Sequence, residues 1–131
     1  MSARDVKARA EMAREWMAGA RLVLDNHDAA GISHPENQVV SSAVHAGIAA
    51  ADAICGHYLR VRSSSGDHGA AVLLLEKAGP NGKTLANDLK RLITEKTNAE
   101  YSAEYLSAAK VKALLRSAQN LIEALDTELR V

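Results

Sequence analysis

Apolar residues in the first half of the chain recur every three or four positions. Between residue 3 and about residue 27 they form one stripe, made of Val6, Ala10, Ala13, Met17, Ala20, Leu24 and His27. A second stripe of valines, small residues, Ile54 and Tyr58 runs from about residue 35 to residue 59. Because side chains three and four positions apart share one face of a helix, the two stripes predict two long helices.

Three shorter helices are predicted in the second half, at residues 67–78, at 83–96 and from Ser102 or Ser107 to residue 129. Turn-forming residues separate the predicted helices: Gly31 with Pro35, a Ser- and Gly-rich segment at 60–68, a Gly-Pro-Asn-Gly run at 79–82, and a loop at 97–102. The chain contains no internal repeat or linker. The sequence therefore predicts one all-α domain, residues 1–131, folded as an up-and-down bundle of about five helices.

Composition supports this fold class. The chain is rich in alanine, has no Phe and contains only 3% aromatic residues, which favours helices that approach closely. Lys and Arg together number 16, the same as Asp and Glu, so the formal net charge is zero. Strong nucleic-acid binders are usually basic overall, so this balance argues against unspecific DNA coating but leaves room for a local basic site.

Cysteine usage and apolar runs predict a cytoplasmic protein. Cys55 is the only cysteine, so an intrachain disulfide and a CxxC metal motif are both excluded. The first residues lack the apolar core of a signal peptide, and Asp52 interrupts the longest apolar run, so we expect no membrane span. A domain of this length folds without metals or disulfides, and we expect no metal or other cofactor.

The strongest candidate for chemistry is the segment before the third predicted helix, where Arg62 and His68 are separated by five residues. An arginine holds phosphate oxygens in bidentate fashion, the start of a helix adds backbone N–H donors, and a histidine transfers protons near neutral pH. These groups suffice for metal-independent RNA cleavage, in which the ribose 2′-hydroxyl attacks the adjacent phosphate. The plain alternative is a solvated arginine and a histidine bonded to the backbone.

Other polar residues, Ser63, His57 and Asp67, are candidate helpers at this site. His57 lies near the end of the second predicted helix, where it is either a second proton-transfer group or a residue favoured by the helix dipole. Asp67 or Ser65 is expected to cap the third helix, beside His68. Lys90, Arg91 and Lys96 make one predicted helix basic, and such a face either guides an RNA backbone or is simply solvated.

Two further patterns carry less weight. His45 and Asp52 lie seven positions apart on one helix face, which is compatible with a metal site or a charge relay but is more typical of a satisfied polar contact. Gly82-Lys83-Thr84 is part of a P-loop motif, but the glycine spacing is wrong and no strand precedes it.

The order of motifs between residues 41 and 129 resembles the HEPN family of small prokaryotic helical proteins. The similar features are Arg62 and His68 with five residues between them, the apolar helix after His68, the Ala-Glu-Tyr run at 99–101 and the alanine-rich last helix. Two positions differ: Ser63 follows Arg62 where many active members have Asn, Asp or His, and Ala70 replaces a tyrosine that a partner nucleotidyltransferase modifies in some members.

The resemblance implies a function and partners. It implies a homodimeric endoribonuclease of toxin or defence type, in which Arg62 and His68 act without a metal, with an antitoxin- or nucleotidyltransferase-type partner. Non-catalytic relatives imply the alternative, a dimeric module that binds a nucleotide or a protein. The small-residue face of the second helix, around Gly47, would serve either as a dimer seam or as a packing surface inside the monomer.

Overall fold

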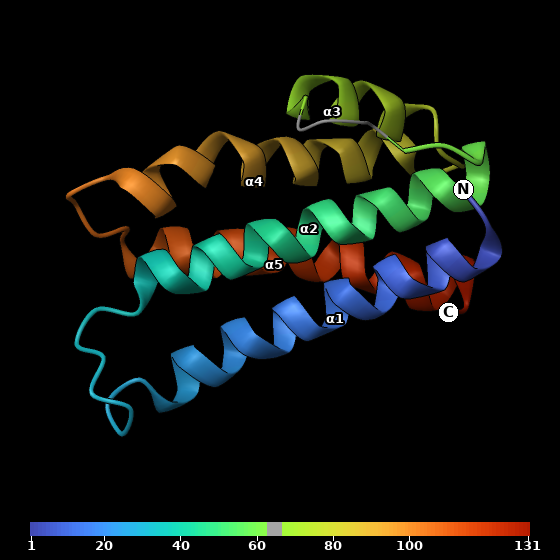
Figure 1. Cartoon of the computed structure of the whole chain (residues 1–131). Helices are drawn as coiled ribbons and strands as arrows, with labels where there is room; N and C mark the ends of the chain where they lie inside the picture. The colour runs from blue at the N-terminus through green and yellow to red at the C-terminus, as the bar shows by residue number, and fades with distance from the viewer. Residues whose placement is uncertain (63–66) are drawn as a thin grey trace.

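The computed structural model describes residues 1–62 and 67–131. Over these residues the chain forms five α-helices and no β-strand (Figure 1). The helices are α1 (Ala3–Asn26), α2 (Glu36–Leu59), α3 (His68–Glu76), α4 (Gly82–Tyr101) and α5 (Ala108–Ala124), followed by a π-helical turn, η1 (Leu125–Leu129). The predicted all-α bundle is confirmed.

Short polar side chains define where three of the helices begin. Ser2 and Asp5 form a reciprocal capping box at the start of α1. The Asp67 carboxylate accepts the Ala70 N–H at 3.0 Å at the start of α3, as predicted. The Ser107 hydroxyl accepts the Lys110 N–H at 3.1 Å, so α5 begins after Ser107 rather than after Ser102.

Helix α4 is longer than the sequence pattern predicts. It continues through Tyr101, so the loop expected at residues 97–102 is wrong. Ala99 is buried in this last turn, and Glu100 accepts the Ser41 hydroxyl at 3.2 Å. These contacts with α2 stabilise helical backbone in a stretch where the local composition favours a turn.

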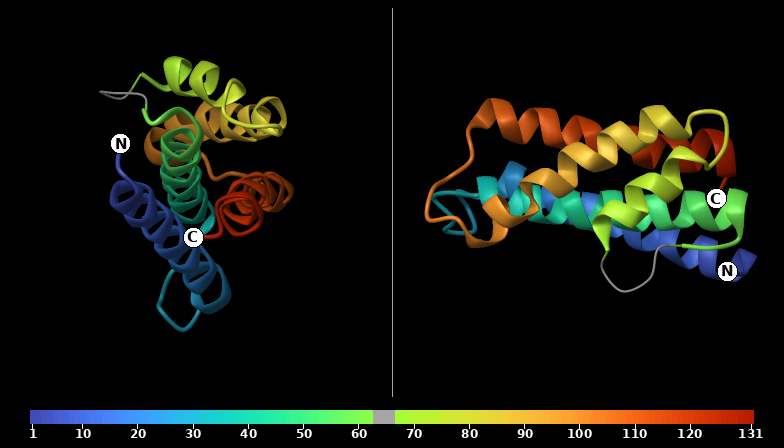
Figure 2. Two further views of the ribbon diagram at one scale, coloured as in Figure 1. Left: turned by 90° about the vertical axis from the view of Figure 1, so that its right-hand side faces the viewer. Right: turned by 90° about the horizontal axis from the view of Figure 1, so that it is seen from above.

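The four long helices α1, α2, α4 and α5 alternate in direction, and α3 is the exception (Figure 1). The chain turns back after α2, so α3 runs in the same direction as α2 and lies along the outside of α4. The end view shows α2 among α1, α4 and α5, with α1 and α3 on opposite sides of the bundle (Figure 2).

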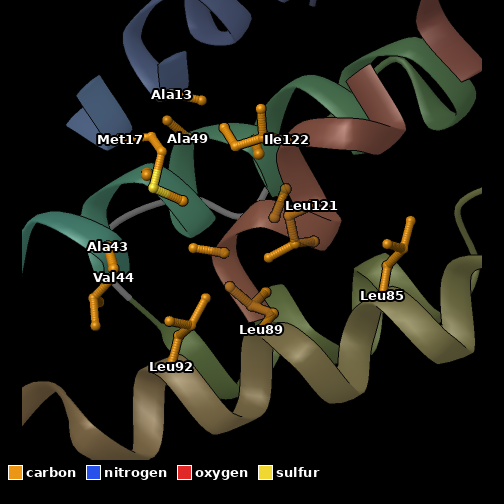
Figure 3. Close-up of a cluster of buried hydrophobic side chains, with 14 of the residues drawn as sticks. Ala13, Met17, Ala43, Val44, Ala49, Leu85, Leu89, Leu92, Leu121 and Ile122 are labelled. Carbon is orange, nitrogen blue, oxygen red and sulfur yellow. The ribbon is translucent and has the colours of Figure 1, made fainter. Parts of the chain in front are cut away.

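Helix α2 is the core helix, and its small-residue face packs inside the monomer. Val44 of α2 lies with Leu89, Leu92 and Leu121 in the buried cluster (Figure 3). A Cβ atom at Gly47 would lie 2.5 Å from Leu92 Cδ1, so only glycine permits this approach without a shift. The sequence left open whether this face was a dimer seam, and the structure uses it to pack α2 against α4 and α5.

By length and composition alone, α2 is also apolar enough to cross a membrane. Its best window of 18 residues has a mean hydropathy of 1.4, and 72% of that window is buried inside the bundle. A buried core helix has the same composition as a membrane span, so this property is weak evidence for a membrane.

Candidate functional site

Arg62 lies just beyond α2 and pairs with a carboxylate inside that helix. Its Nη1 atom is 3.5 Å from Asp52 Oδ2, and Arg9 Nη2 of α1 donates to the same oxygen at 2.8 Å. The left-handed backbone of Arg60, with φ of 64°, ends α2 before Arg62. One carboxylate therefore holds two arginines that come from different parts of the chain.

Asp52 is one of the few buried charged residues described. Burial raises the pKa of its carboxyl group, while the positive charges of Arg9 and Arg62 and their hydrogen bonds act in the opposite direction. Because a buried charge is costly when it loses its partners, the carboxylate fixes both guanidinium groups close to one point.

A hollow of about 530 Å³ adjoins this cluster. Its lining includes three arginines, Arg9, Arg60 and Arg62, together with the carboxylate side chain of Asp5. Asp5 is already bound by the backbone N–H of Ser2 at 3.0 Å and by the Ser2 hydroxyl at 2.9 Å. Those bonds lower the pKa of Asp5, so it stays ionised while the guanidinium groups dominate the charge of the hollow.

His68 is the first residue of α3, and it contacts a lysine from α4. Its Nε2 atom lies 3.2 Å from Nζ of Lys96. A lysine ammonium only donates hydrogen bonds, so a hydrogen bond at this contact requires the imidazole tautomer that carries its hydrogen on Nδ1. The structure thus brings together His68 and Lys96, which the sequence assigned to proton transfer and phosphate binding.

The other candidate residues are not part of this contact. Arg62 is bonded to Asp52, whereas His68 is bonded to Lys96, so the two predicted catalytic residues have separate protein partners. His57 is exposed and stacks edge-on against Tyr58, with 4.8 Å between the ring centroids. Ser63 lies outside the described residues.

Lys90 and Arg91 face a different hollow, of about 430 Å³, between α4 and α5. Arg91 donates to Asp88 at 3.0 Å, and Lys110 in the same hollow donates to Glu95 at 2.8 Å. Neighbouring carboxylates therefore compensate two of these cations locally. The predicted basic face of α4 is divided between two sides of the helix, and only Lys96 lies beside His68.

His45 and Asp52 have different partners, although they share the sequence spacing of one helix face. The His45 ring stacks on Trp16 with 4.6 Å between centroids, and its Nε2 atom is 3.6 Å from Glu100. Within residues 1–62 and 67–131, no three His, Cys, Asp or Glu side chains gather in a group that would hold a metal ion.

Sequence reasoning missed Arg9 and the role of Asp52. The two residues are 43 positions apart, and no short motif links them. The one available signal was the long helix pattern on both sides, which shows that α1 and α2 pack together but not in which register. Arg60 was overlooked because an exposed arginine at a helix end is common.

No family model, curated protein or solved structure matches the chain. The HEPN resemblance therefore still rests on the order of the sequence motifs. The structure defines an all-α helical bundle with an arginine cluster around Asp52 and a His68–Lys96 pair at the start of α3.

Proposed function

We propose that this chain is a HEPN-like endoribonuclease that cleaves RNA without a metal ion, through Arg62 and His68. The contact between Lys96 Nζ and His68 Nε2 is the observation that carries the proposal. It sets the amino group of a lysine beside an imidazole nitrogen, a combination suited to binding a phosphate next to a hydroxyl that must lose a proton.

In this proposal His68 acts as the general base. An RNA phosphate would draw the Lys96 ammonium away and leave Nε2 free to take the proton of the ribose 2′-hydroxyl. The 2′-oxygen then bonds to phosphorus, and the bond from phosphorus to the 5′-oxygen breaks. The leaving 5′-oxygen takes a proton from a general acid, a group other than the His68 that acted as the base. Arg62 would stabilise the charge that develops on the phosphate.

A second copy of the chain would supply that acid, so we propose a homodimer in which two Arg62 and His68 segments meet. The outer face of α1 offers apolar surface for contact with another chain, since Met12 and Trp16 are 42% and 41% exposed. Cytoplasmic location and an antitoxin- or nucleotidyltransferase-type partner belong to the same proposal.

RNA cleavage by the purified protein in the presence of EDTA tests the proposal. We expect the wild type to cut a mixed-sequence RNA pool, and His68→Ala to lose activity by at least about 100-fold, the range typical for removal of a general base. His57→Ala is the matched control, because His57 is an exposed histidine at the end of α2 whose ring stacks on Tyr58.

Thermal unfolding of all three proteins shows whether they are equally folded. Cleavage by a well-folded His68→Ala protein at the wild-type rate would exclude the assigned role. Absence of cleavage by the wild type over the whole RNA pool would favour the second candidate.

That second candidate is a non-catalytic module that binds a nucleotide or a protein. The separate pairing of Arg62 with Asp52 and of His68 with Lys96 favours it, because each residue already has a structural partner. Nucleotides would then raise the unfolding temperature more than sulfate at equal ionic strength, without any turnover.

A further inference from the structure

The hollow lined by Arg9, Arg60 and Arg62, called here the arginine pocket, is separate from the His68–Lys96 contact. We propose that the arginine pocket is a binding site for a phosphate group, free or at the end of a nucleotide or an RNA strand. The proposal rests on the proposed function only in sharing Arg62, and it holds whether or not the protein cleaves RNA.

Charge is the first argument. Three arginines are among the residues that line the pocket, and the neighbouring carboxylates are those of Asp52 and Asp5. Asp52 lies beneath the arginines and is buried, while Asp5 is tied to Ser2. The pocket therefore keeps a positive excess at its open side, which attracts an anion.

Preorganisation is the second argument. Asp52 draws Arg9 of α1 and Arg62 to one oxygen, so two guanidinium groups already converge before any ligand arrives. A guanidinium has five N–H donors, and Asp52 accepts from a single nitrogen of each arginine. Arg9 Nε is buried and has no hydrogen-bond partner among the described residues. Arg9 Nη1 also donates to Met12 Sδ at 3.3 Å, so the half-exposed Arg62 offers the accessible donors for phosphate oxygens, which arginine binds in bidentate geometry.

The third argument is the backbone of Arg60. It has a left-handed conformation, φ 64°, at the end of α2, where glycine is the usual residue. Arg60 holds this conformation although glycine would adopt it with less strain, and Arg60 is one of the residues that line the pocket.

The hollow between α4 and α5 lacks these features and supplies a control. Arg91 is the one arginine among its lining residues, Asp88 pairs with it at 3.0 Å, and Glu95 pairs with Lys110, so no second arginine converges there. If phosphate only sought exposed cations, both hollows would bind it equally. A difference between them therefore measures the specific contribution of the arginine pocket.

The test is titration of the full chain with inorganic phosphate, followed by calorimetry and by thermal unfolding, with chloride at matched ionic strength as reference. We expect phosphate to bind and to raise the unfolding temperature, because a ligand that binds only the folded state stabilises it. Arg9→Gln should weaken binding by at least about tenfold, the loss expected for one charge-assisted bidentate contact. Arg91→Gln should bind as the wild type does.

Arg62→Gln is the second variant, needed if Arg9→Gln fails to fold, because the Arg62 side chain is half exposed and contributes less to packing. Stabilisation by phosphate no greater than by chloride overturns the proposal, as does wild-type affinity in a folded Arg9→Gln or Arg62→Gln protein. Phosphate binding without RNA cleavage would remove only the proposed nuclease function. Cleavage that depends on His68 without phosphate binding would remove only the pocket.

Discussion

Arg60 has a backbone conformation that lowers the stability of the fold, and it lies at the proposed arginine pocket. Its left-handed backbone is stabilised by the hydrogen bond from its N–H to the Gly56 carbonyl at 3.1 Å, and its side chain is exposed. An L-residue in this conformation costs roughly 1–2 kcal/mol more than glycine. Arginine therefore lowers the stability of the fold at this position compared with glycine. A role of the side chain in binding would explain why the position is not a glycine.

We predict that Arg60→Gly raises the free energy of unfolding by about 1 kcal/mol, because the strain disappears and an exposed side chain contributes little packing. Urea unfolding at neutral pH measures the change. The same variant should bind phosphate more weakly than the wild type. A variant that is less stable than the wild type would show that the side chain is needed for the fold itself.

For individual residues, the sequence predicted a local role such as helix capping better than it predicted contacts with residues far away in the chain. Local spacing predicted that Asp67 or Ser65 caps α3, and the structure shows that Asp67 is the cap. The pairing of Asp52 with Arg9 and Arg62 could not be predicted, because it depends on the register in which α1 packs on α2. His45 and Asp52 share a spacing but not a partner, because the ring of Trp16 and Glu100 lie closer to His45.

The junction between α3 and α4 depends on one glycine. Gly82 begins α4 and is buried against the end of α3, where a Cβ atom would lie 2.5 Å from the Leu75 carbonyl oxygen and 2.7 Å from that of Glu76. Backbone atoms cannot move aside as the end of a flexible side chain can. The two helices would have to separate to admit a methyl group.

Gly82→Ala should therefore lower the free energy of unfolding by about 1–3 kcal/mol, as overpacking does in other cores. Gly19→Ala in α1 is the matched control, since a Cβ atom there meets no atom within 4 Å. Alanine is favoured over glycine in a helix, so the control should gain about 0.5–1 kcal/mol. Urea unfolding of both proteins gives the two values, and equal effects would contradict the close approach of α3 and α4.

The elements themselves were largely predictable, and the errors have physical causes. Periodicity identified α1, α2, α4 and α5 because each buries a stripe of apolar side chains, whereas α3 was predicted as a short apolar segment and buries only Leu75. It failed at the end of α4, where Ala99 and Glu100 are held by α2. It also missed the π-helical turn after Ala124, in which both Leu125 and Leu129 remain buried.

For the whole molecule, the sequence predicted the bundle but not how its one short helix lies. Strict alternation would put α3 antiparallel to α2, whereas the chain turns back after α2 so that both run the same way (Figure 1). This reversal brings the start of α3 beside α4, which allows His68 to meet Lys96. The contact between His68 and Lys96 therefore depends on the direction of α3. The spacing of motifs in the sequence does not predict that direction.

The last prediction concerns whether one chain or two form the proposed nuclease site. Within one chain, Arg62 is bonded to Asp52 and His68 to Lys96, so the two residues act on different partners. If the active site lies between two copies, each copy contributes one Arg62 and one His68. A mixed dimer of Arg62→Ala and His68→Ala chains would then retain one of each.

We expect each variant alone to be inactive on RNA, and their mixture, after unfolding and refolding together, to recover part of the wild-type activity. Mixing without refolding is the control, because subunits that do not exchange should give no recovery. A mixture that stays inactive, although mass spectrometry shows mixed dimers, would place Arg62 and His68 of one chain in the same site. A chain that remains monomeric at micromolar concentration would remove the shared site altogether, since no second copy would be present to complete it.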